Sequence, residues 1–257
     1  KGHQFDRDVA LIMVVCDDQI KCAVVSAGKD RIARNGAGHI NAFNMLDNMD
    51  GITAIVSIGI LTCAAICAFP FSDNNLFFTF ICGGTVAALL GFLMFNWHPS
   101  KIYMGDTGSQ MLGALLAGIG VLFFWNNETI AEHHEWYSKV AVVMTAFVIP
   151  IADTLTVTIN RLAAGKSPFV GGRDHTTHHL SYMGYSDRGV AYIMMVISTL
   201  SIALVATLKF APDLNLPIFF SVVALYAVLI IGFLYGTTLK RSMKSTFEAT
   251  KVQSALE

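Results

Sequence analysis

Long apolar runs are the feature that most constrains how this chain can fold. From residue 52 onward they recur with lengths of about 20 residues, which is the length that crosses the hydrocarbon layer of a bilayer as an α-helix. The composition agrees, because 54% of the 257 residues are hydrophobic and only 14% are charged. A soluble domain normally carries about 25% charged residues. The sequence therefore predicts an all-α fold, a polytopic helical bundle integral to a membrane.

Six runs are long enough to be full spanning helices. They are expected at residues 52–71, 76–95, 108–125, 140–159, 190–210 and 217–235. Three regions follow from this division: residues 1–50 as an incomplete N-terminal membrane region with acidic motifs, residues 51–236 as the transmembrane core, and residues 237–257 as a basic tail.

Lysine and arginine are distributed unevenly over the connections between these runs. One set of connections holds Lys101, Arg161, Lys166, Arg173, Arg188, Lys240, Arg241, Lys244 and Lys251. The opposite set holds only Lys139 and Lys209. Cytoplasmic loops are enriched in these residues, so we expect the first set and the C-terminus to lie in the cytoplasm. The polar motifs described next, apart from Asp153, fall on that side, which favours a single site.

The motif KIYMGDTGSQMLG, residues 101–113, leads into one of the spanning runs. An ionised carboxylate beside a membrane is costly, so Asp106 is a functional candidate. Its oxygens suit a hard cation such as Mg²⁺, and Gly105 and Gly108 allow the backbone to approach a ligand closely. Lys101 could neutralise a phosphate that shares the cation with Asp106. This pattern predicts a site for phosphates at the bilayer surface.

A second polar motif, NAFNMLDNMDG, precedes the first spanning run. Its polar residues are Asn41, Asn44, Asp47, Asn48 and Asp50. If the segment is helical, the three asparagines share one face and the two carboxylates follow at three-residue spacing. This stripe favours recognition of a polar ligand, with one carboxylate acting as a base or cation ligand. The alternative is a helix cap followed by a turn at Gly51.

Two further acidic sites lie in or beside apolar segments. Asp17 and Asp18 end a short apolar segment, and adjacent carboxylates stay ionised only if water, a cation or a base neutralises them. A solvated helix end explains that pair equally well. Asp153 lies inside the fourth run, which Pro150 interrupts. An intramembrane carboxylate is a functional hypothesis by default, and a structural carboxylate bonded to a neighbouring helix is the alternative.

The long connection at residues 160–188 contains Arg173 and the histidines His175, His178 and His179. Long connections are usually functional or disordered, and this composition suits anions. Contact with phosphate, or proton transfer by histidine, is favoured over zinc binding. No cysteine or histidine elsewhere completes a tetrahedral zinc set.

These motifs, in this order, resemble the polyprenyl-phosphate N-acetylhexosamine-1-phosphate transferase superfamily, glycosyltransferase family 4. The likeness runs from about Asp17 to Arg188 and includes NWHPSKIYMGDTGSQMLG and GKSPF…GRDHTTHHL. The second string is closer to the UDP-GlcNAc:undecaprenyl-phosphate GlcNAc-1-phosphate transferase branch than to the phospho-MurNAc-pentapeptide transferase branch. The resemblance implies a multi-pass protein of the bacterial inner (cytoplasmic) membrane with a cytoplasmic active site.

The resemblance also implies the chemistry. A UDP-N-acetylhexosamine would give its sugar 1-phosphate to polyprenyl (undecaprenyl) phosphate, releasing UMP and starting a cell-envelope glycan, with Mg²⁺ as cofactor and Mn²⁺ as a substitute. By this resemblance Asp106 is the metal ligand, and the catalytic residues are Asp17, Asp18, Asp47, Asp50, His178 and His179. The substrate-binding residues are Asn41, Asn44, Asn96, Lys101, Arg173 and His175. No nucleic-acid partner is expected, and a homodimer is left open.

Three departures from the family's pattern stand out. Asn48 occupies a position where the family usually has glycine, and the histidine motif carries one extra residue between His175 and His178. The interval from Asp18 to Asn41 is shorter than the family's, so we expect segments to be missing there. Outside this family, the alternative of a different class is an ion-coupled transporter, in which Asp153 and the asparagine stripe line the ion path.

Overall fold

The computed structural model describes residues 46–68, 73–125, 136–165, 174–211 and 216–254. These residues form helices joined by turns and loops, and no strand occurs among them. The helices, in chain order, are α2 (Ile52–Ala68), α3 (Asp73–Asn96), α4 (Gly105–Ile119), the π-helix η1 (Gly120–Trp125), α6 (Trp136–Ala146), α7 (Val148–Ala163), α8 (Thr176–Tyr182), α9 (Asp187–Phe210) and α10 (Leu216–Ser254). The predicted all-α fold is confirmed. The predicted basic tail begins inside α10, which continues as helix to Ser254.

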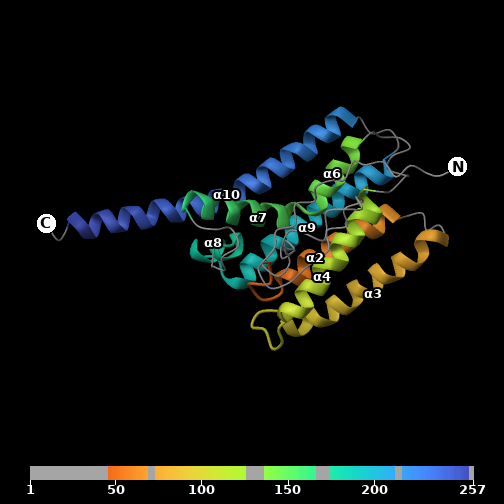
Figure 1. Ribbon diagram of the computed structural model, residues 1–257, viewed down its shortest axis with the longest axis horizontal. Helices are drawn as coiled ribbons and strands as arrows, with labels where there is room; N and C mark the ends of the chain where they lie inside the picture. The colour runs from red at the N-terminus through yellow and green to blue at the C-terminus, as the bar shows by residue number, and fades with distance from the viewer. Residues whose placement is uncertain (1–45, 69–72, 126–135, 166–173, 212–215, 255–257) are drawn as a thin grey trace, which may run out of the picture.

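The helix α2 lies at the centre of the bundle (Figure 1). It packs mainly against α9 and α3, and also contacts α4, η1 and α6. Its sequence has no continuous polar face, and a helix that is apolar all round is one that is buried. The contact with α9 is close, as the position of Gly59 shows: a Cβ there would lie 2.9 Å from the Cβ of Ser198. Small residues of this kind allow helices in a membrane to approach one another.

Fewer helices satisfy the requirements of a membrane span than the sequence predicted. Three do so, at Thr79–Asn96, Asp187–Phe210 and Ile218–Leu239, and a fourth span results if α6 and α7 are counted together. The prediction of six spans is therefore wrong in number for the described residues. The helix α2 is only 17 residues long, and α4 ends at Ile119, where the chain passes into the π-helix η1. The apolar composition still indicates a multi-pass membrane protein.

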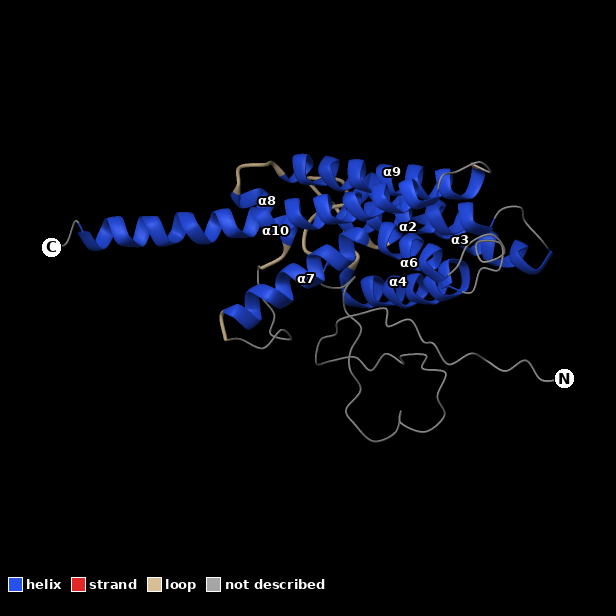
Figure 2. Cartoon of the chain, turned by 90° about the horizontal axis from the view of Figure 1, so that it is seen from above, coloured by secondary structure: helices blue, strands red, loops and turns tan. Residues whose placement is uncertain are grey.

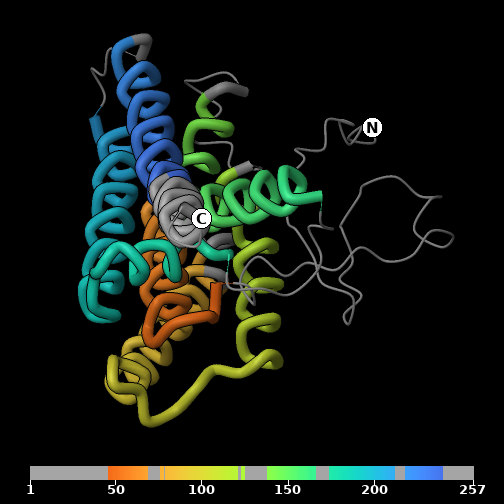
Figure 3. Tube along the Cα trace, turned by 90° about the vertical axis from the view of Figure 1, so that its left-hand side faces the viewer, coloured from red at the N-terminus to blue at the C-terminus, as the bar shows by residue number. Residues whose placement is uncertain are grey.

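The fourth predicted span is bent by 75° between α6 and α7. The break falls at Phe147, three residues before Pro150. Proline lacks an N–H donor, and its ring clashes with the carbonyl of the residue four positions earlier, which here is Ala146. As a result α7 runs across the direction of the other helices (Figures 2 and 3).

The polar motifs meet at one end of the bundle. The N-terminal end of α2, the loop between α3 and α4, α8 and the start of α9 lie together there (Figure 1). Arg188 lies in the first turn of α9 at this end, whereas Lys209 lies at the opposite end of the same helix. This arrangement agrees with the uneven distribution of cations in the sequence.

Candidate active site

Two carboxylates from separate motifs approach one another at this end. Asp47 is half-buried in the turn before α2, and Asp106 is exposed in the first turn of α4. Burial raises the pKa of Asp47 above its usual value, and the negative charge of Asp106 raises it further. The hydroxyl of Thr53 lies beside Asp47 and lowers the pKa, although its geometry falls short of a hydrogen bond. The two motifs therefore face the same small region.

This pair of carboxylates fits a divalent cation. The charge of Asp106 disfavours the ionised form of Asp47, and a cation between two neighbouring carboxylates would stabilise that form. Mg²⁺ commonly takes one or two protein carboxylates and completes its shell with water and substrate phosphates. Among the residues that the structure describes, no group of three or more His, Cys, Asp or Glu side chains could hold a metal alone. The donor set thus suits Mg²⁺ shared with a phosphate better than a closed zinc site.

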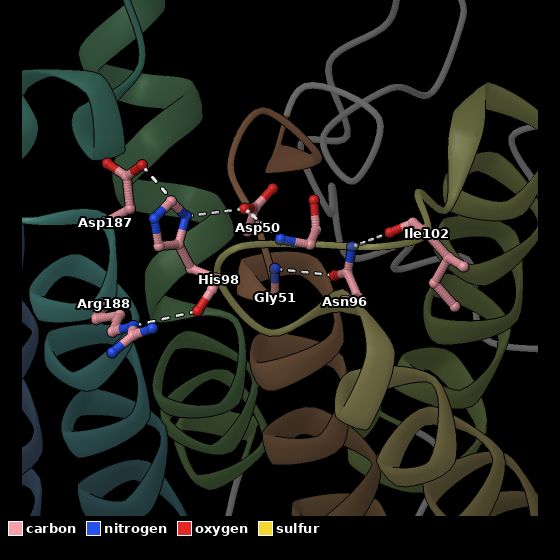
Figure 4. Close-up of polar contacts among 8 residues, drawn as sticks. Asp50, Gly51, Asn96, His98, Ile102, Asp187 and Arg188 are labelled. Carbon is pink, nitrogen blue, oxygen red and sulfur yellow. Dashed lines mark hydrogen bonds and ion pairs between the residues drawn. The ribbon is translucent and has the colours of Figure 1, made fainter.

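Asp50 is directed to a different set of partners (Figure 4). Its Oδ2 accepts hydrogen bonds from Nδ1 of His98 at 2.9 Å and from the backbone N–H of Ser100 at 3.1 Å. Burial alone would raise the pKa of Asp50, but the hydrogen bonds from Ser100 and His98 outweigh it and hold the pKa below its usual value. A carboxylate of lowered pKa is a weak base. The geometry therefore favours an anchoring role for Asp50 over the predicted catalytic one.

Asn96 ties two backbone segments together (Figure 4). It is only 5% exposed. Its Oδ1 accepts from the N–H of Gly51 at 2.8 Å, and its Nδ2 donates to the carbonyl of Ile102 at 2.8 Å. Gly51 has φ of 76°, which favours glycine, and a Cβ there would lie 3.1 Å from Leu93. Asn96 was predicted to bind substrate, but both the oxygen and the nitrogen of its amide bond to the protein's own backbone.

Asp153 belongs to the same end of the molecule. Its carboxylate accepts three hydrogen bonds, from His175 Nδ1 at 2.9 Å and from the N–H and Oγ1 of Thr176, each at 2.8 Å. All three residues are buried. The sequence reading set Asp153 apart from the other polar groups, and this is wrong because the bend before α7 brings it to the start of α8. The alternative of a carboxylate bonded to a neighbouring helix is confirmed.

The three predicted histidines occupy different environments. His175 is buried with Nδ1 bonded to Asp153, and His179 is buried beside the ring of Tyr182. His178 is half-buried, with its ring centroid 6.3 Å from that of His175. Consecutive residues on a helix point in different directions, so His178 and His179 do not face one ligand together. His178 is the histidine of the three that is accessible.

The helix α8 is joined to the turn that carries Asp47. Oγ1 of Thr177 donates to Oδ1 of Asn48 at 2.6 Å. Thr177 precedes His178, and Asn48 follows Asp47 in the chain. The contact therefore places the accessible histidine of α8 next to the turn whose carboxylate faces Asp106.

Comparison with known proteins places this arrangement in a family. Residues 35–124 match the family described as Glycosyl transferase family 4, and this segment includes both Asp47 and Asp106. The decaprenyl-phosphate N-acetylglucosaminephosphotransferase of Mycolicibacterium smegmatis is 30% identical over 186 residues, which are 67% of this chain and 45% of that protein. The chain belongs to glycosyl transferase family 4.

Other relatives of this family 4 chain carry similar names. The Mycobacterium leprae protein with the same name is 28% identical over 186 residues, which are 67% of this chain and 46% of that protein. The undecaprenyl-phosphate alpha-N-acetylglucosaminyl 1-phosphate transferase of Escherichia coli K12 is 29% identical over 216 residues, which are 80% of this chain and 53% of that protein. The chain spans about half the length of the curated relatives it matches.

The remaining predicted site residues of this family 4 chain divide into two groups. Lys101 is exposed in the loop that joins α3 to Asp106, and its backbone N–H donates to the carbonyl of Phe95 at 2.8 Å. The others lie outside the described residues: Asp17, Asp18, Asn41, Asn44 and Arg173.

Sequence reasoning missed several residues at this end, namely His98, Ser100, Thr177 and Asp187. His98 and Ser100 lie inside the NWHPSK segment, where a histidine beside a proline carries no specific signal. Ser186 followed by Asp187 indicates only the start of a helix, and Ser186 does cap α9. Their contacts depend on the tertiary fold.

Proposed function

We propose that this chain transfers N-acetylglucosamine 1-phosphate from a UDP-linked donor to polyprenyl phosphate. The observation that carries the proposal is the approach of Asp47 and Asp106 beside the accessible His178. Membership of glycosyl transferase family 4 supports it, as do relatives whose names specify decaprenyl or undecaprenyl phosphate and N-acetylglucosamine. The product would be the first lipid-linked intermediate of a cell-envelope glycan.

The reaction exchanges one phosphorus–oxygen bond for another. An oxygen of the lipid phosphate attacks the β-phosphorus of the UDP-sugar, and the bond from that phosphorus to UMP breaks. UMP leaves with the bridging oxygen and its electron pair, and the new diphosphate joins the sugar to the lipid. Phosphoryl transfer of this kind depends on positioning and charge stabilisation more than on covalent chemistry by the protein.

The side chains at the site match those needs. Asp47 and Asp106 would hold Mg²⁺, which neutralises diphosphate charge when bound. Lys101, exposed in the loop that leads to Asp106, would pair with a phosphate oxygen, and His178 would donate a hydrogen bond or a proton to the diphosphate. By the family resemblance, Asp17 or Asp18 would receive the proton of the lipid phosphate.

The place of the site suits a substrate that lies in the bilayer. Its residues lie at the ends of membrane-length helices, where the phosphate of a polyprenyl lipid meets water. Lys101, Arg161 and Arg188 lie at this end of the bundle. By the positive-inside rule this end would face the cytoplasm across the inner membrane of a bacterium.

The proposal is tested with the purified chain reconstituted in lipid nanodiscs that contain undecaprenyl phosphate. UDP-GlcNAc and UDP-MurNAc-pentapeptide are supplied separately, with Mg²⁺, with Mn²⁺ or with EDTA, and UMP and the lipid product are measured. We expect UMP release with UDP-GlcNAc and a divalent cation, and loss of the reaction in EDTA. Turnover with UDP-MurNAc-pentapeptide alone would overturn the assignment of the sugar. An absence of UMP release with both donors, together with ion flux in vesicles, would favour a transporter.

A matched pair of variants tests the metal site. Asp106→Asn is expected to lower UMP release on the order of 100-fold or more, because the carboxylate contributes to the transition state through charge. Asp73→Asn removes a carboxylate at the opposite end of α3 from Asn96 and is expected to keep full activity. Full activity in Asp106→Asn would remove Asp106 from the proposed site.

A further inference from the structure

A histidine that the proposed chemistry does not use joins three segments of the chain around the site. We propose, on the basis of the transferase function proposed above, that His98 is a positioning residue. It fixes the loop at residues 97–104 to the turn before α2 and to the start of α9, so that Lys101 and Asp106 face Asp47.

The contacts of His98 come from both sides of the loop (Figure 4). Its Nδ1 lies 2.9 Å from Oδ2 of Asp50 and 3.5 Å from Oδ2 of Asp187. Nε of Arg188 donates to the backbone carbonyl of His98 at 3.1 Å. Both charged residues in the first turn of α9 are thus directed to this one residue.

The other hydrogen bonds of the loop lead to α3 and to the turn before α2, and Trp97 at its start packs edge to face against Tyr192 of α9. The backbone N–H of Ser100 donates to Asp50, and that of Lys101 donates to Phe95. The carbonyl of Ile102 accepts from Asn96. Within the described residues, the hydrogen bonds and ion pairs that connect this loop to α9 are those of His98.

The position of Asp106 explains why the attachment matters. The loop passes directly into Gly105, where φ is 69°, and then into the first turn of α4. A Cβ at Gly105 would have no neighbour within 4 Å, whereas Met104 before it packs against the core and the buried Ser109 hydroxyl donates to the carbonyls of Gly105 and Asp106 at 3.2 Å. These contacts hold the first turn of α4 from within the helix, and the anchoring of the preceding loop adds to them in setting the orientation of Asp106 relative to Asp47.

The geometry assigns His98 to positioning because its Nδ1 is already directed to two carboxylates. Asp50 and Asp187 are acceptors, so Nδ1 carries the proton of the tautomer that donates. An asparagine side chain places an N–H donor near the same position but cannot act as an acid or base. The two replacements His98→Ala and His98→Asn therefore separate anchoring from imidazole chemistry.

The test combines amide hydrogen exchange with kinetics on the full chain in nanodiscs. Loss of a charge-assisted hydrogen bond shifts the equilibrium between the anchored and the open loop by about 10-fold or more. Because His98 is partly exposed, we expect a shift near the lower limit. We expect His98→Ala to raise exchange about 10-fold at residues 97–104 and in the first turn of α4, and to lower kcat/KM about 10-fold. His98→Asn should restore most of both. Asp187→Asn, which alters a more exposed partner, should raise exchange about threefold.

The control is His134→Asn, which alters a histidine in the connection predicted to lie on the opposite side of the membrane, and it should change neither readout. Unchanged exchange at residues 97–104 in His98→Ala would overturn the positioning role, and so would exchange raised equally along the whole chain. Normal exchange with lost turnover in His98→Asn would also overturn it, because the imidazole itself would then be required. If the wild-type chain releases no UMP while exchange responds as expected, the proposed function fails and the anchoring role stands.

Discussion

Replacement of Asn96 by alanine distinguishes a site held by backbone anchors from one in which this amide binds the nucleotide. The substitution removes the acceptor of the Gly51 N–H and the donor to the Ile102 carbonyl. Gly51 is buried, so its N–H would have no replacement partner. Ile102 is 40% exposed, and water can reach its carbonyl more easily.

The expected magnitude follows from these two environments. An unsatisfied buried N–H costs about 1–3 kcal/mol, and loss of a partly exposed hydrogen bond costs about 0.5–1.5 kcal/mol. Together they predict that Asn96→Ala lowers the free energy of unfolding by about 2–4 kcal/mol. In a chain of this size each kcal/mol shifts Tm by about 2–4 °C, so Tm should fall by about 5–15 °C.

Thermal unfolding is measured with a thiol-reactive fluorophore, because Cys63, Cys67 and Cys82 are buried in the folded chain. Cys16 and Cys22 lie outside the described residues and are replaced by serine in every variant. The control is Thr85→Val in the same helix. The Thr85 hydroxyl bonds the carbonyl of Ile81 within α3, so its loss should change Tm by less than about 2 °C.

The decisive comparison is between Tm and turnover. If Asn96→Ala melts within about 2 °C of the Thr85→Val control but loses UMP release, the amide contacts the substrate and the reasoning from its backbone bonds is refuted. If Tm falls as expected, the loss of turnover follows from displacement of the Gly51 turn and of the loop after α3.

Three further predictions concern the carboxylates. Asp153→Ala leaves the donors of His175 and Thr176 buried without an acceptor, so thermal melts should show a loss of about 3–5 kcal/mol, and an unchanged Tm would contradict the observed bonds. The raised pKa of Asp47 contributes stability that is present below the unfolded pKa of 3.8 and is lost as pH rises through the higher folded pKa. At pH 7 we therefore expect Asp47→Asn to have a higher Tm than wild type while losing turnover. A lower Tm than wild type would contradict the raised pKa. Saturating Mg²⁺, at about 100 times its Kd, should stabilise the wild-type chain by about 2.7 kcal/mol but not Asp106→Asn, and an equal shift in both would locate the cation elsewhere.

Much of the helical architecture was predictable because it depends on local properties of the sequence. Apolar runs of membrane length and the proline at position 150 indicated helices and an interruption, and the 75° bend lies where Pro150 would place it. The number of spans was not predictable in the same way. The transition of α4 into a π-helix at Gly120 accompanies the packing of Phe147 against this position, where a Cβ would lie 3.1 Å from the ring. No periodicity in the sequence encodes that contact.

The residues of the candidate site were likewise predictable from local sequence only in part. The residue types and spacing in the two aspartate motifs indicated Asp47 and Asp106, and the fold brings these side chains close enough for the charge of Asp106 to raise the pKa of Asp47. The link from Asn48 to Thr177 joins distant segments, and only tertiary structure could reveal it. The same holds for Asp50, which has the same residue type and nearly the same place in the motif as Asp47, but a different set of neighbours.

Three aspartates lie at one end of this molecule, and we infer a different role for each because their neighbours differ. Asp153 is buried and accepts three hydrogen bonds, so it is committed to holding the start of α8. Asp50 accepts from His98 and Ser100, which lower its pKa and commit it to the loop after α3. Burial and the negative charge of Asp106 raise the pKa of Asp47, and the hydroxyl of Thr53 beside it offsets them only in part. A cation bound together with a substrate phosphate would supply the missing stabilisation, so we expect the proposed diphosphate substrate to bind where the fold leaves negative charge least compensated.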